Sequence, residues 1–90
     1  MTEKELFEKN LEISSEFSRY IVAHPEVSEK IPLDAEIIFI LESDPAFSRH
    51  NLKLAKQLKA NGEEVVLVKI KGLRPIEESR LIKPHLEFAA

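Results

Sequence analysis

The sequence predicts an α/β fold: an N-terminal helix, then a right-handed βαβ unit whose small, mostly parallel sheet of two to three strands is covered by two long helices. An apolar repeat of helical period runs from about residue 3 to residue 23 and returns from 45 to 60. Two short runs rich in β-branched residues, at 35–41 and 64–70, flank the second repeat. Short links join strand, helix and strand, as in a right-handed crossover between parallel strands.

The bulk composition narrows the class of protein. Ninety residues correspond to a single domain spanning 1–90. The chain has no cysteine, so disulfides and cysteine-ligated zinc are excluded, and no apolar run approaches the roughly 20 residues of a membrane span. A net charge of −3 argues against a basic groove for nucleic acid. We therefore expect a cytoplasmic protein without a membrane or nucleic-acid partner, and its abundant Glu and Lys lean towards a thermophilic composition.

The first helix has clear signals at both ends. Thr2 and Glu5 have the spacing of a capping box, so the helix is predicted to start at about Glu3. The residue before a proline is pushed out of helical geometry, so the helix ends near Ala23, just before His24-Pro25. A short helical turn is expected to follow over residues 25–30.

The βαβ unit is equally well marked. Residues 35–41 are almost continuously apolar, as expected of a strand covered on both faces. Asp44 followed by Pro45 is a strong helix start, and Asn61-Gly62 is a typical helix exit. Residues 64–70 are predicted to form the second strand.

The region after Gly72 is less regular. Ser79–Ile82 is apolar enough for a short strand, and Leu86–Phe88 alternates as an edge strand would. Pro84 lies between them and argues against one continuous central strand. These two segments are the candidates for a third strand.

An asparagine lies in the middle of the apolar stripe of each long helix. Asn10 and Asn51 occupy equivalent positions in two patterns offset by 41 residues. An amide in such a position needs a partner or costs about 1–3 kcal/mol. One interpretation is a structural polar lock, in which the two amides meet each other or a backbone carbonyl and fix the helix register. The alternatives are that they line a ligand pocket, or that the predicted helix phase is wrong and leaves them exposed.

The end of the first predicted strand is the best place for a ligand. In parallel sheets, ligands bind beyond the carboxyl ends of strands, and a helix start there can hold an anion. The candidate binding residues are Ser43, Asp44, His50 and Asn51, and Glu42 with Asp44 offers two carboxylates to Mg²⁺. The segment has no glycine to wrap a phosphate, so the simpler interpretation is that Asp44 caps the helix and Glu42 is solvated.

The sequence supplies no recognisable catalytic set. The three histidines have no metal-ligand spacing, and no serine lies in a nucleophile-elbow motif. The basic residues near the C-terminus are balanced by neighbouring glutamates. No catalytic residue, metal ligand or cofactor is therefore predicted, and the chain is not expected to be an enzyme.

The stretch from Asn10 to Tyr20, followed by His24-Pro25-Glu26, resembles the opening of a small family of uncharacterised prokaryotic α/β proteins. The segments Asp44-Pro45, Asn51-Leu52 and 65–70 are similar to that family as well, so the resemblance spans most of the chain. The resemblance implies a compact α/β domain of unknown function and carries over no residue role.

Two functions are compatible with these patterns. A sheet this thin needs fewer apolar side chains than the first helix supplies, and the excess includes Phe7, Leu11 and Val22, with Ser14 and Ser18 between them. The leading hypothesis is therefore a non-enzymatic interaction module that forms a homodimer through the first helix or a sheet edge. The alternative is a domain that binds a small ligand, an anion or a metal at the end of the first strand.

Overall fold

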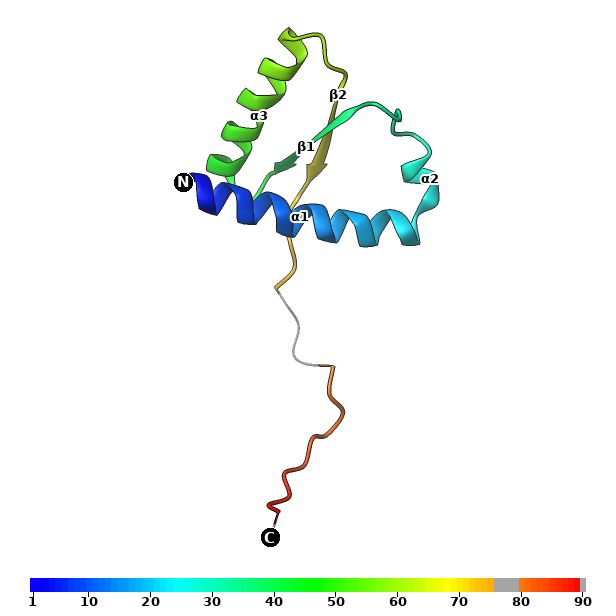
Figure 1. Cartoon of the computed structure of the whole chain (residues 1–90), viewed down its shortest axis with the longest axis vertical. Coiled ribbons are helices and arrows are strands. Elements are labelled where there is room, and N and C mark those ends of the chain that lie inside the picture. The colour runs from blue at the N-terminus through cyan, green and yellow to red at the C-terminus, as the bar shows by residue number, and fades with distance from the viewer. Residues whose placement is uncertain (76–79, 90) are drawn as a thin grey trace.

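The chain begins with its longest helix and ends in an extended segment that leaves the folded body (Figure 1). The computed structural model describes residues 1–75 and 80–89. Its elements are, in chain order, α1 (Glu3–Ala23), α2 (Pro25–Ser28), β1 (Glu36–Leu41), α3 (Pro45–Ala60) and β2 (Val65–Ile70). These bounds lie within one or two residues of the predicted ones, and the small α/β fold is confirmed.

Both long helices begin at the predicted caps. The Thr2 hydroxyl accepts a hydrogen bond from the Glu5 amide at 3.1 Å, and the Asp44 carboxylate accepts one from the Phe47 amide at 3.2 Å. Each satisfies an N–H group that the helix itself leaves without a partner. After α3 the chain reverses at Gly62, whose φ of 84° lies in the left-handed region that glycine adopts without strain.

The sheet consists of β1 and β2, which pair in parallel with Glu36 opposite Val65 and Leu41 opposite Ile70. Residues 38–41 of β1 are all buried, whereas β2 alternates between half-buried and exposed side chains after its second residue. Thus β1 is covered on both faces, as its continuous apolar run predicts, and β2 lies nearer to solvent.

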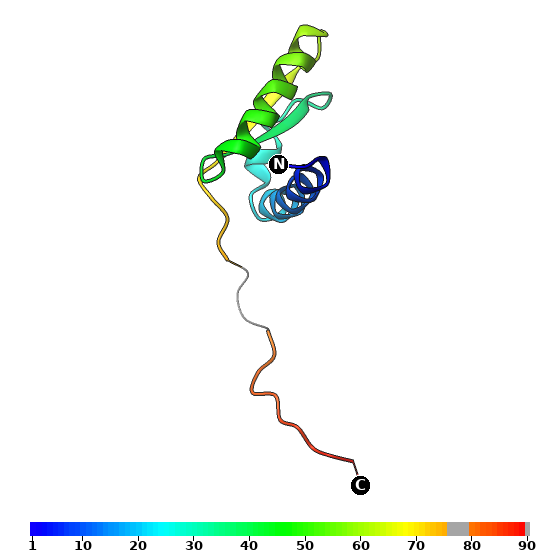
Figure 2. The ribbon, with the colours of Figure 1, turned by 90° about the vertical axis from the view of Figure 1, so that its left-hand side faces the viewer.

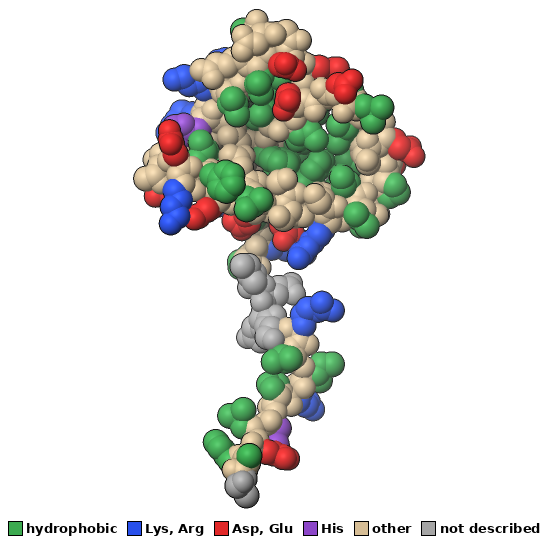
Figure 3. All heavy atoms as spheres, in the orientation of Figure 1, with side chains coloured by type: hydrophobic (Ala, Val, Ile, Leu, Met, Phe, Trp, Pro, Cys, Tyr) green, Lys and Arg blue, Asp and Glu red, His purple; other side chains and the backbone are tan. Residues whose placement is uncertain are grey.

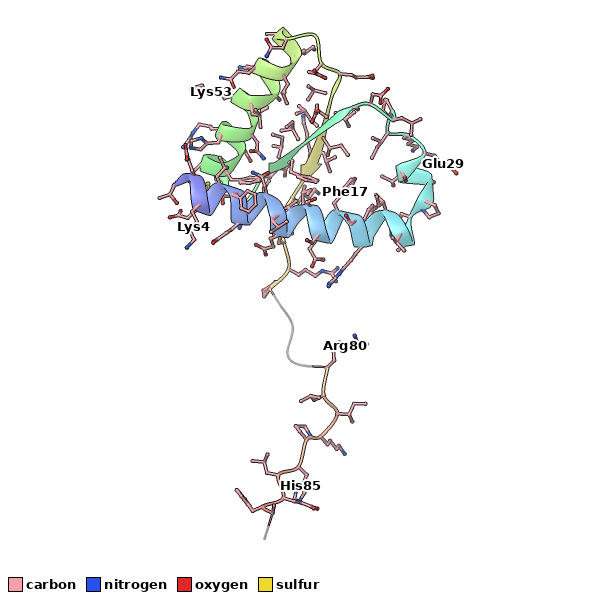
Figure 4. The ribbon with its side chains drawn as sticks, in the orientation of Figure 1. Lys4, Phe17, Glu29, Lys53, Arg80 and His85 are labelled. Atoms are coloured by element: carbon pink, nitrogen blue, oxygen red, sulfur yellow. The ribbon has the colours of Figure 1, made fainter. Side chains whose placement is uncertain are left out.

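The two long helices cover opposite faces of this sheet, as Figure 2 shows from the side. On one face, Ile13 of α1 packs in a cluster with Phe39 and Leu41, and Phe17 meets Phe39 edge to face at 5.5 Å between ring centres. The Phe17 side chain is labelled in Figure 4. Phe47, fully buried in the first turn of α3, joins the same cluster.

On the other face, Ala55 of α3 packs against Ile38 and Ile40, with Leu58 beside them. Side chains alternate across a strand, so consecutive residues of β1 belong to different clusters. The core is therefore two thin apolar layers with β1 between them.

The expected third strand does not form in the described residues. Residues 80–82 and 86–88 are not in a strand, and Ser79 lies outside the described residues. The backbone of Lys83 has a φ of 42°, which is incompatible with a strand, and the side chains of Ile82, Leu86 and Phe88 are exposed. Without a neighbouring strand to pair with, an apolar alternation alone does not create a strand.

Candidate functional site

The two asparagines lie against each other where α1 meets α3. The Asn51 amide nitrogen donates to the Asn10 side-chain oxygen at 3.0 Å, and the Asn10 nitrogen lies 3.4 Å from the Asn51 oxygen. Asn51 is only 2% exposed, and Asn10 is half-buried. The Asn10 nitrogen also donates to the Leu6 carbonyl at 3.0 Å. The pair therefore joins two helices through a reciprocal amide contact.

Asn51 also reaches the backbone of β1. Its nitrogen donates to the Phe39 carbonyl at 2.8 Å. One turn earlier, the Ser48 hydroxyl accepts from the Leu41 amide at 2.9 Å and donates to the Leu41 carbonyl at 2.7 Å. These backbone groups lie on the edge of β1 that faces away from β2. Two buried side chains of α3 therefore bond three backbone groups on this edge of β1, which a neighbouring strand would otherwise bond.

Ser48 is a structural residue that the sequence analysis missed. It lies three residues before Asn51, so the two side chains are neighbours on one helix face. A pair of small polar residues on the buried face of a crossover helix was the available signal. Among the described residues, no buried side-chain nitrogen or oxygen lacks a partner. The buried side-chain polar atoms of this seam are therefore all bonded within the fold.

The four predicted ligand-binding residues do not gather around one cavity. Ser43 and His50 are exposed, Asp44 caps α3, and Asn51 points into the protein. None of them lines either of the two grooves described below. Within residues 1–75 and 80–89, no three histidine or acidic side chains are placed to hold a metal ion.

Two open grooves flank α1 instead. The β1 groove, of about 380 Å³, lies between α1, the segment after α2 and β1; its lining includes Ser14, Ser18, Ile31, Leu33 and Ile37. Hydrophobic side chains are visible in the hollow framed by the helices in Figure 3. The β2 groove, of about 450 Å³, is lined by Tyr20, Val27, Val68, Ile70 and Leu73, among others. It is more apolar than the β1 groove, whose lining includes three serines.

The surface of α1 also carries apolar side chains that nothing in the described chain covers. Phe7 is 67% exposed, Leu11 57% and Val22 83%. Ile13 is the one buried residue of this helix. At about 100° per residue, the exposed side chains form a line beside the core-facing residues, and Ser14 and Ser18 lie along it. We call Phe7, Leu11, Ser14, Ser18 and Val22 the α1 stripe.

Comparison with known proteins places the chain in a family. Residues 5–83 match the family described as "Family of unknown function (DUF5647)". The chain belongs to DUF5647. This membership confirms the resemblance to a family of unknown function. No curated protein and no solved structure matches the chain.

Several polar side chains of this DUF5647 domain are already hydrogen-bonded within the fold. The hydroxyls of Ser15 and Ser18 donate back to α1 carbonyls at 3.0 Å, and Ser48 and Asn51 are bonded to β1. In the described part of the chain, no helix is long and apolar enough to cross a bilayer. Among the described residues, apolar surface without an intramolecular role includes the α1 stripe and the lining of the β2 groove, whereas the β1 groove is of mixed polarity.

Proposed function

We propose that this DUF5647 chain is a non-enzymatic interaction module that forms a homodimer through α1. In this dimer, the two copies of α1 pack antiparallel about a two-fold axis at the helix midpoint. The observation that carries the proposal is the exposure of Phe7, Leu11 and Val22 in one line on a helix whose other apolar face already covers the sheet. Contiguous apolar surface of this kind is typical of protein interfaces.

The spacing of the α1 stripe suits helix pairing. Phe7, Leu11, Ser14 and Ser18 are four, three and four residues apart, which is the spacing of the contact positions in a coiled coil, and Val22 extends the line by four more. The two serines lie near the middle, where small side chains allow two helix axes to approach closely.

The α1 stripe is also complementary to a second α1 stripe that runs in the opposite direction. A two-fold axis between residues 14 and 15 places Phe7 opposite Val22 of the partner subunit, and Leu11 opposite Ser18 of the partner subunit. Large side chains therefore face smaller ones along the whole line. An interface about a two-fold axis must be self-complementary in this way, because the same surface serves both copies.

Charges beside the stripe agree with the same arrangement. Glu8 and Arg19 lie on one flank of the stripe, and in an antiparallel pair each flank faces the same flank of the other helix. Glu8 then lies two residues, or about 3 Å along the axis, from Arg19 of the partner subunit. Arg19 is highly exposed, and its ion pair with Glu16 at 3.4 Å is weak and easily exchanged.

The expected affinity is modest. Three partly exposed side chains per subunit contribute six contacts of about 1.5–2 kcal/mol each. Association itself costs about 4 kcal/mol or more. The difference corresponds to a dissociation constant between roughly 1 µM and 1 mM. The oligomeric state must therefore be measured over a range that extends to about 1 mM.

Sedimentation equilibrium over this range tests the proposal. Leu11→Glu is expected to give a monomer, because it buries a carboxylate in the seam; Leu54→Glu, at an exposed leucine of α3, is the matched control and keeps the dimer. Glu8→Arg is expected to weaken the dimer and the combination with Arg19→Glu to restore it, while Glu63→Arg has no effect. A wild-type chain that is monomeric at 1 mM, or a charge swap that fails to rescue, contradicts the proposed dimer.

A further inference from the structure

The outer edges of β1 and β2 differ in whether their backbone groups are hydrogen-bonded. The outer edge of β1 is occupied by Ser48 and Asn51. On the side of β1 that faces β2, the Glu36 backbone amide donates to the Glu64 carbonyl at 2.7 Å. The Glu42 backbone amide donates to the Ile70 carbonyl at 2.8 Å. Since backbone groups alternate between the two sides of a strand, those of Val65, Leu67 and Lys69 face outwards from β2. No described residue bonds to this edge, so β2 is an open template for another strand.

The β2 groove runs along this open edge. Val68 and Ile70 expose one face of β2 to the groove, and Leu73 continues the apolar lining beyond the strand. Tyr20 of α1 forms part of the opposite wall. A strand added to the edge of β2 would therefore place every second side chain over this apolar surface, which gives backbone pairing and side-chain burial together.

The C-terminal segment 80–89 has the pattern of such a strand. Its even positions Ile82, Pro84, Leu86 and Phe88 are apolar, whereas Lys83, His85 and Glu87 between them are polar. This alternation is typical of a strand with one buried face. The apolar side chains are nevertheless uncovered: Ile82 is 90% exposed, Leu86 79% and Phe88 92%. Figure 4 shows Arg80 and His85 on this segment, well away from the helices and strands.

We propose that the open edge of β2, together with residues 71–74 that follow it, binds residues 82–88 of a second copy of this chain as an added antiparallel strand. This inference is independent of the α1 dimer proposed above, because the β2 groove and the α1 stripe lie on opposite flanks of α1. It assigns an occupant to the β2 groove and a role to the C-terminal segment.

Pro84 determines the direction of the added strand. Val68 and Ile70 of β2 direct their side chains over the groove, and their backbone N–H and C=O groups point to β1. A parallel neighbour would keep this relation, so Pro84 would face β2 and remove a ladder bond. An antiparallel neighbour inverts the relation: Pro84 faces solvent, whereas the backbone groups of Glu87 face β2 and those of Lys83 and His85 face the residues that follow it. Proline is tolerated on the outer side of an edge strand, so the antiparallel direction is favoured.

One register satisfies both charge and packing. With Glu87 opposite Lys69, the opposite charges pair on one face of the sheet. The same register places Phe88 beside Val68 and Leu86 beside Ile70, and both β2 residues line the groove. Shifting it by two or four residues towards the start of β2 puts Lys83 opposite Lys71 or Lys69, which is unfavourable. Lys83 must leave its φ of 42° for an extended conformation, which the residue before proline prefers.

The position of the C-terminal segment favours pairing between copies. The described segment runs away from the folded body (Figures 1 and 2), and its apolar side chains Ile82, Leu86 and Phe88 are exposed. A second copy can receive the segment in this extended arrangement, without a return of the chain onto its own β2.

Intermolecular paramagnetic broadening tests this pairing with the full chain. The sequence has no cysteine, so Ala89→Cys gives one attachment site for a nitroxide label. The labelled chain is mixed with an isotopically labelled wild-type chain at about 1 mM total concentration. Ala89 falls opposite Leu67 in the proposed register, so the amide signals of Leu67 and Lys69 in the second chain are expected to broaden.

Variants make the test specific. Leu86→Glu combined with Phe88→Glu in the nitroxide-labelled chain is expected to abolish the broadening, whereas His85→Ser, on the polar face of the same segment, retains it. Leu11→Glu in both chains removes the proposed α1 dimer and leaves the broadening in place, so the two proposals fail separately. Broadening that appears only when both labels are on one chain, or no broadening at 1 mM, overturns the inference.

Discussion

Replacing Asn51 by alanine is the sharpest test of how the two helices and the sheet are joined. The Asn51 amide binds Asn10 of α1 and the Phe39 carbonyl of β1 at once, and it is 2% exposed. Asn51→Ala leaves the Phe39 carbonyl without its partner in a buried position.

The expected loss can be estimated from these contacts. An unsatisfied buried carbonyl costs about 1–3 kcal/mol, and loss of the contact with half-buried Asn10 adds about 1 kcal/mol. Asn51→Ala is therefore expected to lower the free energy of unfolding by about 2–4 kcal/mol. Asn10→Ala should cost only about 1 kcal/mol, because Asn51 keeps its bond to Phe39. A domain of this size has about 5–10 kcal/mol in total, so the difference is readily measurable.

Urea unfolding followed by circular dichroism provides the measurement. With an m-value of about 1 kcal/mol per M, the midpoint for Asn51→Ala should fall by about 2 M or more. The double variant should cost less than the sum of the single ones, since both remove the same contact. Ser15→Ala on the exposed face of α1 is the control and should change little. Equal losses for Asn10→Ala and Asn51→Ala would refute the assignment of Phe39 as the decisive partner.

Three further outcomes follow from the same contacts. Ser48→Ala should lower the free energy of unfolding by about 2–4 kcal/mol in the same urea assay, because it leaves the buried amide and carbonyl of Leu41 unpaired; a loss below 0.5 kcal/mol would contradict the role given to this hydroxyl. Gly62→Ala should cost about 1 kcal/mol or more through its φ of 84° alone, since no atom lies within 4 Å of the added methyl group. Thermal-shift screening with phosphate, nucleotides and divalent cations should leave the midpoint unchanged; a rise that Asp44→Ala removes would instead support the alternative ligand-binding function at the end of β1.

The helices and strands of this protein can be predicted from short stretches of its sequence. Thr2 and Asp44 cap the two long helices, and Gly62 ends the second, because capping depends on side chains a few residues away. The apolar run of β1 predicts burial on both faces, and the short links predict parallel pairing. All of these are interactions over a few residues, so they can be read without knowing the fold.

Only the tertiary structure determined which contacts these helices and strands make with one another. The sequence places Asn10 and Asn51 on apolar stripes, but only packing puts them in contact and turns Asn51 and Ser48 towards the edge of β1. Packing also left the expected third strand unformed in the described residues, because a strand needs a partner that local alternation does not provide. Local propensity depends on neighbours in sequence, whereas burial and edge pairing depend on which surfaces meet, and that is fixed by the whole fold.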